Sequence, residues 1–153
     1  MNKIIFLDVD GVLNCETTKD RLEQRGTGTR YVGIDNKLLL NFKKIIDATN
    51  AKVILSSTWR DHPQFEDYLK EKLSEIGLND LIIDKTQSGI RSNAKRAVEI
   101  NHWLNDHPEI KDYIVIDDMT YGGLDTFEDR FIKTHEMIGL SEKDIEKAIA
   151  KLS

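Results

Sequence analysis

The chain has 153 residues, of which 39% are hydrophobic and 32% are charged, and its formal net charge is −5. This length suits one core, so we expect residues 1–153 to form a single domain. The acidic balance argues against a broad nucleic-acid-binding face. No apolar run approaches the ~20 residues that span a bilayer, and the start of the chain has no signal-peptide pattern. The single cysteine, Cys15, rules out an intramolecular disulfide and is typical of a reducing cytoplasm.

The stretch from Lys3 to Asn14 begins as an apolar run and ends in two carboxylates and a glycine. A short run rich in Ile and Phe predicts a buried strand. Asp8, Asp10 and Gly11 follow it. Because a buried carboxylate is costly unless it is paired or bound to a metal, we expect these acids to open onto a site at the carboxyl edge of a sheet, where ligands of open α/β sheets bind.

The next segment, residues 14–34, is polar and strongly charged, and its glycines indicate turns. About twenty residues are too few for a separate domain. A connection of this length inside a compact domain is usually functional or disordered. We therefore expect a hairpin or a mobile loop here, with a plain surface loop as the alternative.

The rest of the chain alternates helices with short apolar strands. Four helices are expected from apolar faces and capping residues: from Asp35 or Asn36 to about Asn50, from Pro63 to Gly77, from near Ser92 through Leu104, and from Ser141 to Leu152. Four further strands are expected at 52–55, 81–84, 113–116 and 130–134, the last at the sheet edge. This alternation predicts an α/β fold with a parallel sheet between helices.

Polar side chains follow two of these strands directly. Ser56 and Ser57 close one strand, and hydroxyls in that place can hydrogen-bond a phosphoryl oxygen without adding a repelling charge. Asp117 and Asp118 close another strand. Mg²⁺ prefers oxygen ligands and takes one or two carboxylates together with a substrate phosphate. These strand ends therefore predict a metal and phosphate site.

Three cations are candidates for the same site. Arg60 can reach a substrate phosphate as a bidentate donor, or it can form a surface salt bridge; its neighbour Trp59 is expected to pack in the core or a loop. Lys95 and Arg96 lie near the start of the third helix. A phosphate site with several carboxylates needs a fixed cation to offset their repulsion, and at least one of the two is expected to be a solvated helix charge.

Four of these segments resemble the motifs of the haloacid dehalogenase-like (HAD) phosphohydrolases. The acids at 8–10 resemble motif I, the strand closed by Ser56 or Ser57 resembles motif II, and the acid pair at 117–118 resembles motif IV. Lys95 or Arg96 stands where motif III has its cation. The resemblance covers nearly the whole chain. It implies a three-layer Rossmannoid HAD core with a central parallel sheet of about five strands, and a flap at 14–34 with minimal or no cap.

The resemblance also implies chemical roles. Asp8 would be the nucleophile that forms an aspartyl-phosphate, and Asp10 would be the general acid and base. Mg²⁺ would be held by Asp8 and Asp117, with Asp118 orienting a water or the loop and Asp10 contributing its backbone carbonyl. The hydroxyl of motif II and the cation of motif III would bind the substrate phosphate.

The expected activity is hydrolysis of a phosphate monoester. Residues 7–14, 55–60, 96–104 and 116–118 look like the small HAD domains of RNA-repair proteins and the phosphatase half of bacteriophage polynucleotide kinase–phosphatases. That similarity suggests nucleotides or nucleic-acid 3′-phosphate ends as substrates. A phosphatase of small metabolites such as sugar phosphates is the alternative. A receiver-like phosphoacceptor domain is a remote alternative. In receivers the acid pair follows the first strand and the Lys lies near the C-terminus, whereas in this chain the adjacent acid pair comes late and the cation precedes it.

Overall fold

The structure is a computed structural model, and it describes residues 3–16, 18, 33–88, 95–120 and 122–153. Its sheet has five strands in the order β3-β2-β1-β4-β5, and every neighbouring pair is parallel. The strands are β1 (Lys3–Leu7), β2 (Lys52–Leu55), β3 (Ile82–Lys85), β4 (Asp112–Asp117) and β5 (Phe131–Lys133). The predicted α/β fold is confirmed, and β5 lies at an edge of the sheet as expected.

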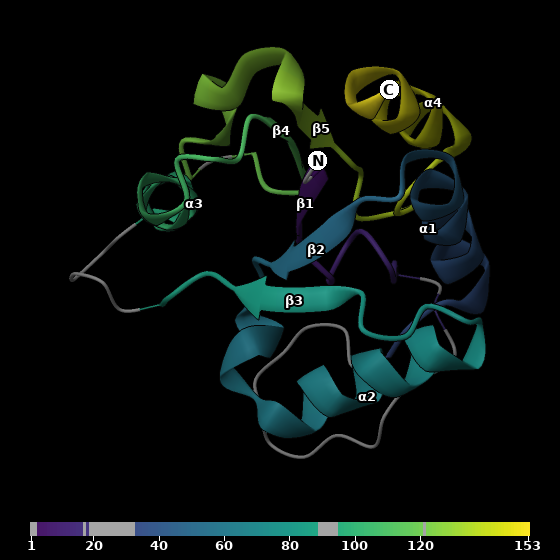
Figure 1. The fold of residues 1–153 in the computed structure, drawn as a ribbon. Helices are drawn as coiled ribbons and strands as arrows, with labels where there is room; N and C mark the ends of the chain where they lie inside the picture. Colours follow the sequence, from purple (N-terminus) through teal and green to yellow (C-terminus); the bar gives the residue numbers. More distant parts are fainter. Residues whose placement is uncertain (1–2, 17, 19–32, 89–94, 121) are drawn as a thin grey trace.

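Helices cover both faces of this sheet (Figure 1). The α-helices of the described residues are α1 (Asn36–Thr49), α2 (Pro63–Glu75), α3 (Arg96–Asp106) and α4 (Glu142–Leu152). Side chains alternate along a strand, so Ile5 and Leu7 pack with α1, α2 and α4, whereas Ile4 and Phe6 pack with α3. The result is the three-layer core that the family resemblance implies. Among the described residues, none of the helices has the length and apolarity needed to cross a membrane.

The strand register brings the ends of three strands level with one another. Leu7 at the end of β1 pairs with Leu55 on β2 and with Ile116 on β4. The backbone N–H of Asp8 then donates to the carbonyl of Ile116 at 3.0 Å, and that of Ser56 donates to the carbonyl of Leu7 at 2.8 Å. The residues that follow these strands therefore meet at one edge of the sheet.

The helix ends follow local sequence signals. Asp35 caps α1, since its carboxylate accepts the backbone N–H groups of Lys37 and Leu38. Gly77 follows α2 with a φ of +83°, and its N–H and that of Leu78 donate to carbonyls in the last turn. Both observations agree with the predicted helix boundaries. Glycine suits the position after α2 because it adopts the left-handed conformation without steric cost.

Two features differ from the prediction, and a third, the flap, cannot be compared with the structure. The helix expected to start near Ser92 begins at Arg96, with Lys95 as its N-cap residue; residues 89–94 are outside the described part. Two 3₁₀ helices, η1 (Thr58–Asp61) and η2 (Leu124–Arg130), were not predicted, because such short turns have no apolar period of their own. The predicted flap at 14–34 lies mostly outside the described residues.

The capping box of α4 provides a test of the local fold. The hydroxyl of Ser141 accepts the N–H of Asp144, and the Asp144 carboxylate accepts the N–H of Ser141. We expect Ser141→Ala to lower the free energy of unfolding by about 1 kcal/mol, since one helix N–H loses its acceptor. Urea denaturation measures the change. Ser74→Ala, on the exposed surface of α2, is the control and should change stability by less than about 0.5 kcal/mol; equal effects of the two substitutions would contradict the role of the cap.

Candidate active site

Three carboxylates from two distant segments meet at the carboxyl edge of the sheet. Asp8 follows β1, and Asp117 and Asp118 lie at the end of β4; one ligand oxygen from each lies within 4.8 Å of the others. Asp8 and Asp117 are only 5% and 1% exposed. The parallel pairing of β1 and β4 is what brings these acids together.

Arg96 is the cation that faces this cluster. Its Nη1 lies 2.7 Å from Oδ2 of Asp117 and 3.3 Å from Oδ1 of Asp8. Lys95 is exposed at the start of α3. Burial by itself would lower the pKa of Arg96, but the charges of Asp8 and Asp117 outweigh it and raise that pKa. Of the two candidate cations for motif III, the structure therefore brings Arg96 to the acids.

The acid cluster carries more negative charge than Arg96 offsets. Burial first, and then the charge of Asp117, raises the pKa of Asp8 well above its usual range. The pKa of Asp118 is raised by the same two causes. Carboxylate oxygens are ligands that Mg²⁺ prefers, and a divalent cation would compensate the excess charge. The residues present therefore fit the magnesium ion that the resemblance implies.

Gly11 and Thr134 shape the loop that follows Asp8. Gly11 has a φ of +79°, and a Cβ atom at this position would overlap the carboxylate of Asp118. The hydroxyl of Thr134, directly after β5, donates to the carbonyl of Gly11 at 2.8 Å. The loop can thus lie close to Asp118 only because residue 11 has no side chain.

Asp10 lies in a different environment from Asp8. Its Oδ1 accepts hydrogen bonds from Nε1 of Trp59 and from Nδ2 of Asn14, each at 3.0 Å. Asn14 is itself fixed, since it also donates to the carbonyl of Gly33 and accepts the N–H of Gly11. Burial raises the pKa of Asp10 to about 6, although the two hydrogen bonds lower it. A carboxyl group with such a pKa can both give and take a proton near neutral pH.

The two serines after β2 are used differently. The hydroxyl of Ser57 caps η1 by accepting the N–H of Trp59 at 3.2 Å. The hydroxyl of Ser56 is buried and has no hydrogen-bond partner among the described residues. Ser56 directly follows β2 as Asp8 follows β1, and the last residues of these strands, Leu55 and Leu7, are paired.

Arg60 is placed differently from the expected phosphate donor. Its Nη2 lies 2.9 Å from Oε2 of Glu99, and its Nη1 donates to the carbonyl of Ser57 at 3.2 Å. Both side chains of this ion pair are buried, so the alternative of a surface salt bridge is wrong. The guanidinium of Arg60 in η1 thus has a carboxylate of α3 as its partner.

The sequence did not reveal the contacts that Trp59, Asn14 and Glu99 make around the site. Trp59 is fully buried, as expected for a packing residue, but its indole also holds Asp10. Glu99 has no role in the sequence-based prediction, and its side chain is buried. Asn14 occupies the fourth position after Asp10 within the motif I stretch, which was the available signal for its contact with that acid.

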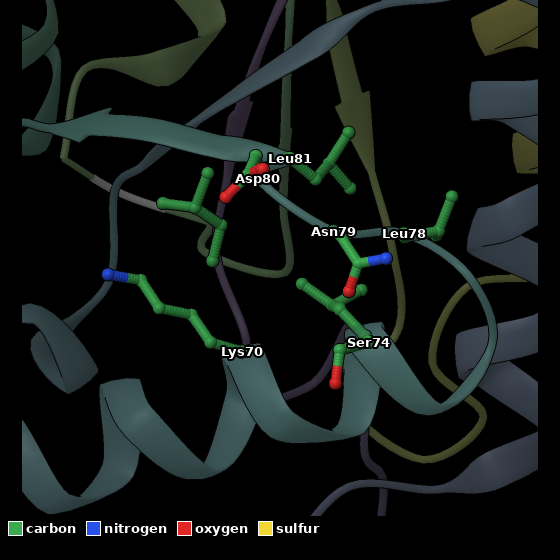
Figure 2. A pocket seen from close by; sticks show the side chains of 8 residues that line it. Lys70, Ser74, Leu78, Asn79, Asp80 and Leu81 are labelled. Atoms are coloured by element: carbon green, nitrogen blue, oxygen red, sulfur yellow. The ribbon is translucent and has the colours of Figure 1, made fainter.

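A separate hollow of about 270 Å³ lies between α2 and the start of β3 (Figure 2). Lys70 and Ser74 border it from α2, and Asn79, Asp80 and Leu81 border it from the segment before β3. This segment enters the strand at its amino end, whereas the acids follow the carboxyl ends of β1 and β4. The hollow is therefore not part of the candidate site.

The raised pKa of Asp10 predicts how stability depends on pH. The folded state binds this proton more tightly than the unfolded chain, where the pKa is 3.8. The stabilisation is therefore fully present below about pH 4 and is lost as pH rises to about 6, which amounts to about 2–3 kcal/mol. Urea denaturation in EDTA should show that the wild type loses stability relative to Asp10→Asn between pH 4 and pH 7. Parallel curves for the two proteins would contradict the shift.

The comparisons with known proteins agree with this geometry. Residues 4–145 match the family described as the HAD domain in Swiss Army Knife RNA repair proteins. The matched region includes all four motif segments. No curated protein is similar enough to the chain to count as a match. The resemblance noted from the motifs is confirmed: the chain belongs to the family of HAD domains found in Swiss Army Knife RNA repair proteins.

Proposed function

We propose that the protein is a Mg²⁺-dependent phosphomonoester hydrolase that works through an aspartyl-phosphate on Asp8. The observation that carries this proposal is the pairing of two unlike acids at one strand end. Asp8 lies against Asp117 and Arg96, while Asp10 accepts the indole N–H of Trp59. Membership of the HAD domain family supports a HAD-type hydrolase.

The phosphate would bind between Ser56 and Arg96. A buried hydroxyl without a partner costs about 1–3 kcal/mol, and a phosphoryl oxygen would relieve that cost at Ser56. Arg96 supplies a fixed positive charge beside the nucleophile. Asp8, Asp117 and Asp118 would hold Mg²⁺, together with the backbone carbonyl of Asp10. When bound, the ion would neutralise the charge of the phosphate and polarise the phosphoryl group.

The two acids divide the chemistry between them. An oxygen of Asp8 attacks phosphorus, and the bond from phosphorus to the leaving oxygen breaks as Asp10 gives that oxygen a proton. Asp10 then takes a proton from water, which attacks the phosphorus of the aspartyl-phosphate and frees Asp8 and inorganic phosphate. The pKa of Asp10, raised to about 6 by burial, suits both transfers.

Nucleic-acid phosphate ends or nucleotides are the substrates we propose. The name of the matched family refers to RNA repair. A hollow of about 390 Å³ borders Asp118, with Thr120, Lys133 and His135 on its walls. This hollow would give the leaving group of the substrate room beside the acids. If that leaving group is anionic, as in a nucleic acid, Lys133 supplies a cation near it.

Substitution of the nucleophile tests the reaction. We expect Asp8→Asn to lower kcat by at least about a thousandfold, because the amide cannot form the phosphoenzyme. Phosphate release in Mg²⁺ should be measured on a 3′-phosphorylated oligonucleotide, nucleoside monophosphates and sugar phosphates. The exposed residue Asp47 on α1 supplies the matched control, Asp47→Asn. Retained turnover in Asp8→Asn would rule out the proposed nucleophile, and a preference for sugar phosphates would indicate a small-metabolite phosphatase.

The metal site has its own test on β4. Asp117 and Asp112 lie at opposite ends of this strand, and Asp112 is exposed. We expect Asp117→Asn to weaken Mg²⁺ binding by at least about tenfold, whereas Asp112→Asn should leave it unchanged. Isothermal titration of the metal-free proteins measures both affinities. Equal affinities for wild type and Asp117→Asn would show that the ion binds elsewhere.

A further inference from the structure

We propose that Arg60 and Glu99 form a positioning pair, which holds the first turn of α3, and with it Arg96, against the segment that carries Trp59. Neither residue is assigned a contact with substrate. The pair links the two sides of the candidate site, because one partner belongs to η1 and the other to α3. Its effect on turnover rests on the proposed function, whereas its effect on geometry does not.

The burial of this pair sets it apart. The side chains of Arg60 and Glu99 are 6% and 9% exposed, and their charged atoms lie 2.9 Å apart. Outside the acid cluster, every other ion pair between described residues has at least one exposed partner, as in Lys44 with Glu142. Removing one partner of a buried pair leaves an uncompensated charge, so the contact strongly constrains both elements.

Each partner of the pair is next to a group of the site. Glu99 lies one helical turn after Arg96, on the same side of α3, and its charge is among those that raise the pKa of Arg96. Arg60 adjoins Trp59, whose indole holds Asp10. Arg60 also donates to the carbonyl of Ser57, so it fixes the turn on both sides of the indole. A shift of the pair would therefore move the donor to Asp10 and the cation beside Asp8.

The rest of α3 is held independently. Trp103 lies in its later turns, and its Nε1 donates to Oδ2 of Asp84 at 2.8 Å. The same ring packs edge-on against Phe6 of β1, with 5.5 Å between the ring centroids. Because this contact and the apolar face of α3 remain, variants of the pair keep a folded helix while its first turn loses one of the contacts that fix its position.

Kinetics distinguish a positioning pair from a phosphate donor. We expect Glu99→Gln and Arg60→Gln each to lower kcat on p-nitrophenyl phosphate by about 10- to 100-fold, with KM changed by less than about threefold. The double variant should be no slower than the slower single variant, since each substitution removes the same contact. The matched control is Glu142→Gln, which breaks the exposed pair with Lys44 and should leave kcat unchanged. If Arg60→Gln raises KM alone while Glu99→Gln stays at wild-type kcat, Arg60 is a phosphate donor and the proposal is wrong.

The indole N–H of Trp59 gives a measurement that needs no turnover. The chain has two tryptophans, so the ¹⁵N–¹H spectrum has two indole signals, and Trp59→Phe identifies the one that matters. Asp10→Asn shows how that signal shifts when its acceptor changes. Glu99→Gln and Arg60→Gln should shift it too, and Glu142→Gln should not. An unshifted Trp59 signal in folded pair variants would overturn the proposal. If the wild type hydrolyses no phosphomonoester, the proposed function fails, and the indole signal still decides the role of the pair.

Discussion

The ion pair of Arg96 with Asp8 and Asp117 is the interaction on which the rest of the site depends. Burying carboxylates at a strand end is costly unless their charge is compensated, and the parallel register of β1 and β4 forces two of them together. Arg96 offsets part of that charge. The N–H of Met119 adds a hydrogen bond to Oδ1 of Asp117. What remains uncompensated is negative charge that a divalent cation could offset, so the electrostatics of the fold favour a metal at this edge.

Asp8 and Asp10 follow the same strand and are only two residues apart, yet their surroundings differ. Asp8 faces other carboxylates and an arginine, whereas Asp10 faces the neutral donors Trp59 and Asn14. Burial is the largest cause that raises the pKa of both acids; Asp117 raises the pKa of Asp8 further, whereas the hydrogen bonds from Asn14 and Trp59 limit the rise at Asp10. In the proposed mechanism, this contrast would let one acid attack phosphorus and the other exchange protons. The proposed division of roles would therefore arise from different neighbours: Asp117 at the end of β4 and Arg96 of α3 for Asp8, and Trp59 of η1 and the nearby Asn14 for Asp10.

Much of this arrangement could be predicted from local sequence. The apolar runs of β1, β2 and β4 end where their polar residues begin, so the acids and serines at the sheet edge were found from pattern alone. The cap of α1 at Asp35 was readable for the same reason. Local signals could not separate Lys95 from Arg96, because neighbouring helix residues face different directions and only the true start of α3 decides between them.

Two of the contacts that were missed join segments far apart in the chain. Glu99 meets Arg60 across 39 residues, and the indole of Trp59 reaches Asp10 across 49. No periodicity or capping pattern encodes such meetings, since they depend on which strands are neighbours and how each turn is aimed. For Arg60, residue chemistry indicated a phosphate donor or a surface salt bridge, and neither reading identified the buried carboxylate of Glu99 as its partner.

The hydrogen bond from Thr134 to the carbonyl of Gly11 has a consequence for biosynthesis. The first loop of the chain obtains this restraint from a residue that the ribosome adds much later, and Leu140 adds another by donating to the carbonyl of Val12. A nascent chain that ends before β5 has its two N-terminal acids but not the strand that fastens their loop. Completion of the centre therefore waits until β5 and the residues up to Leu140 have been synthesised.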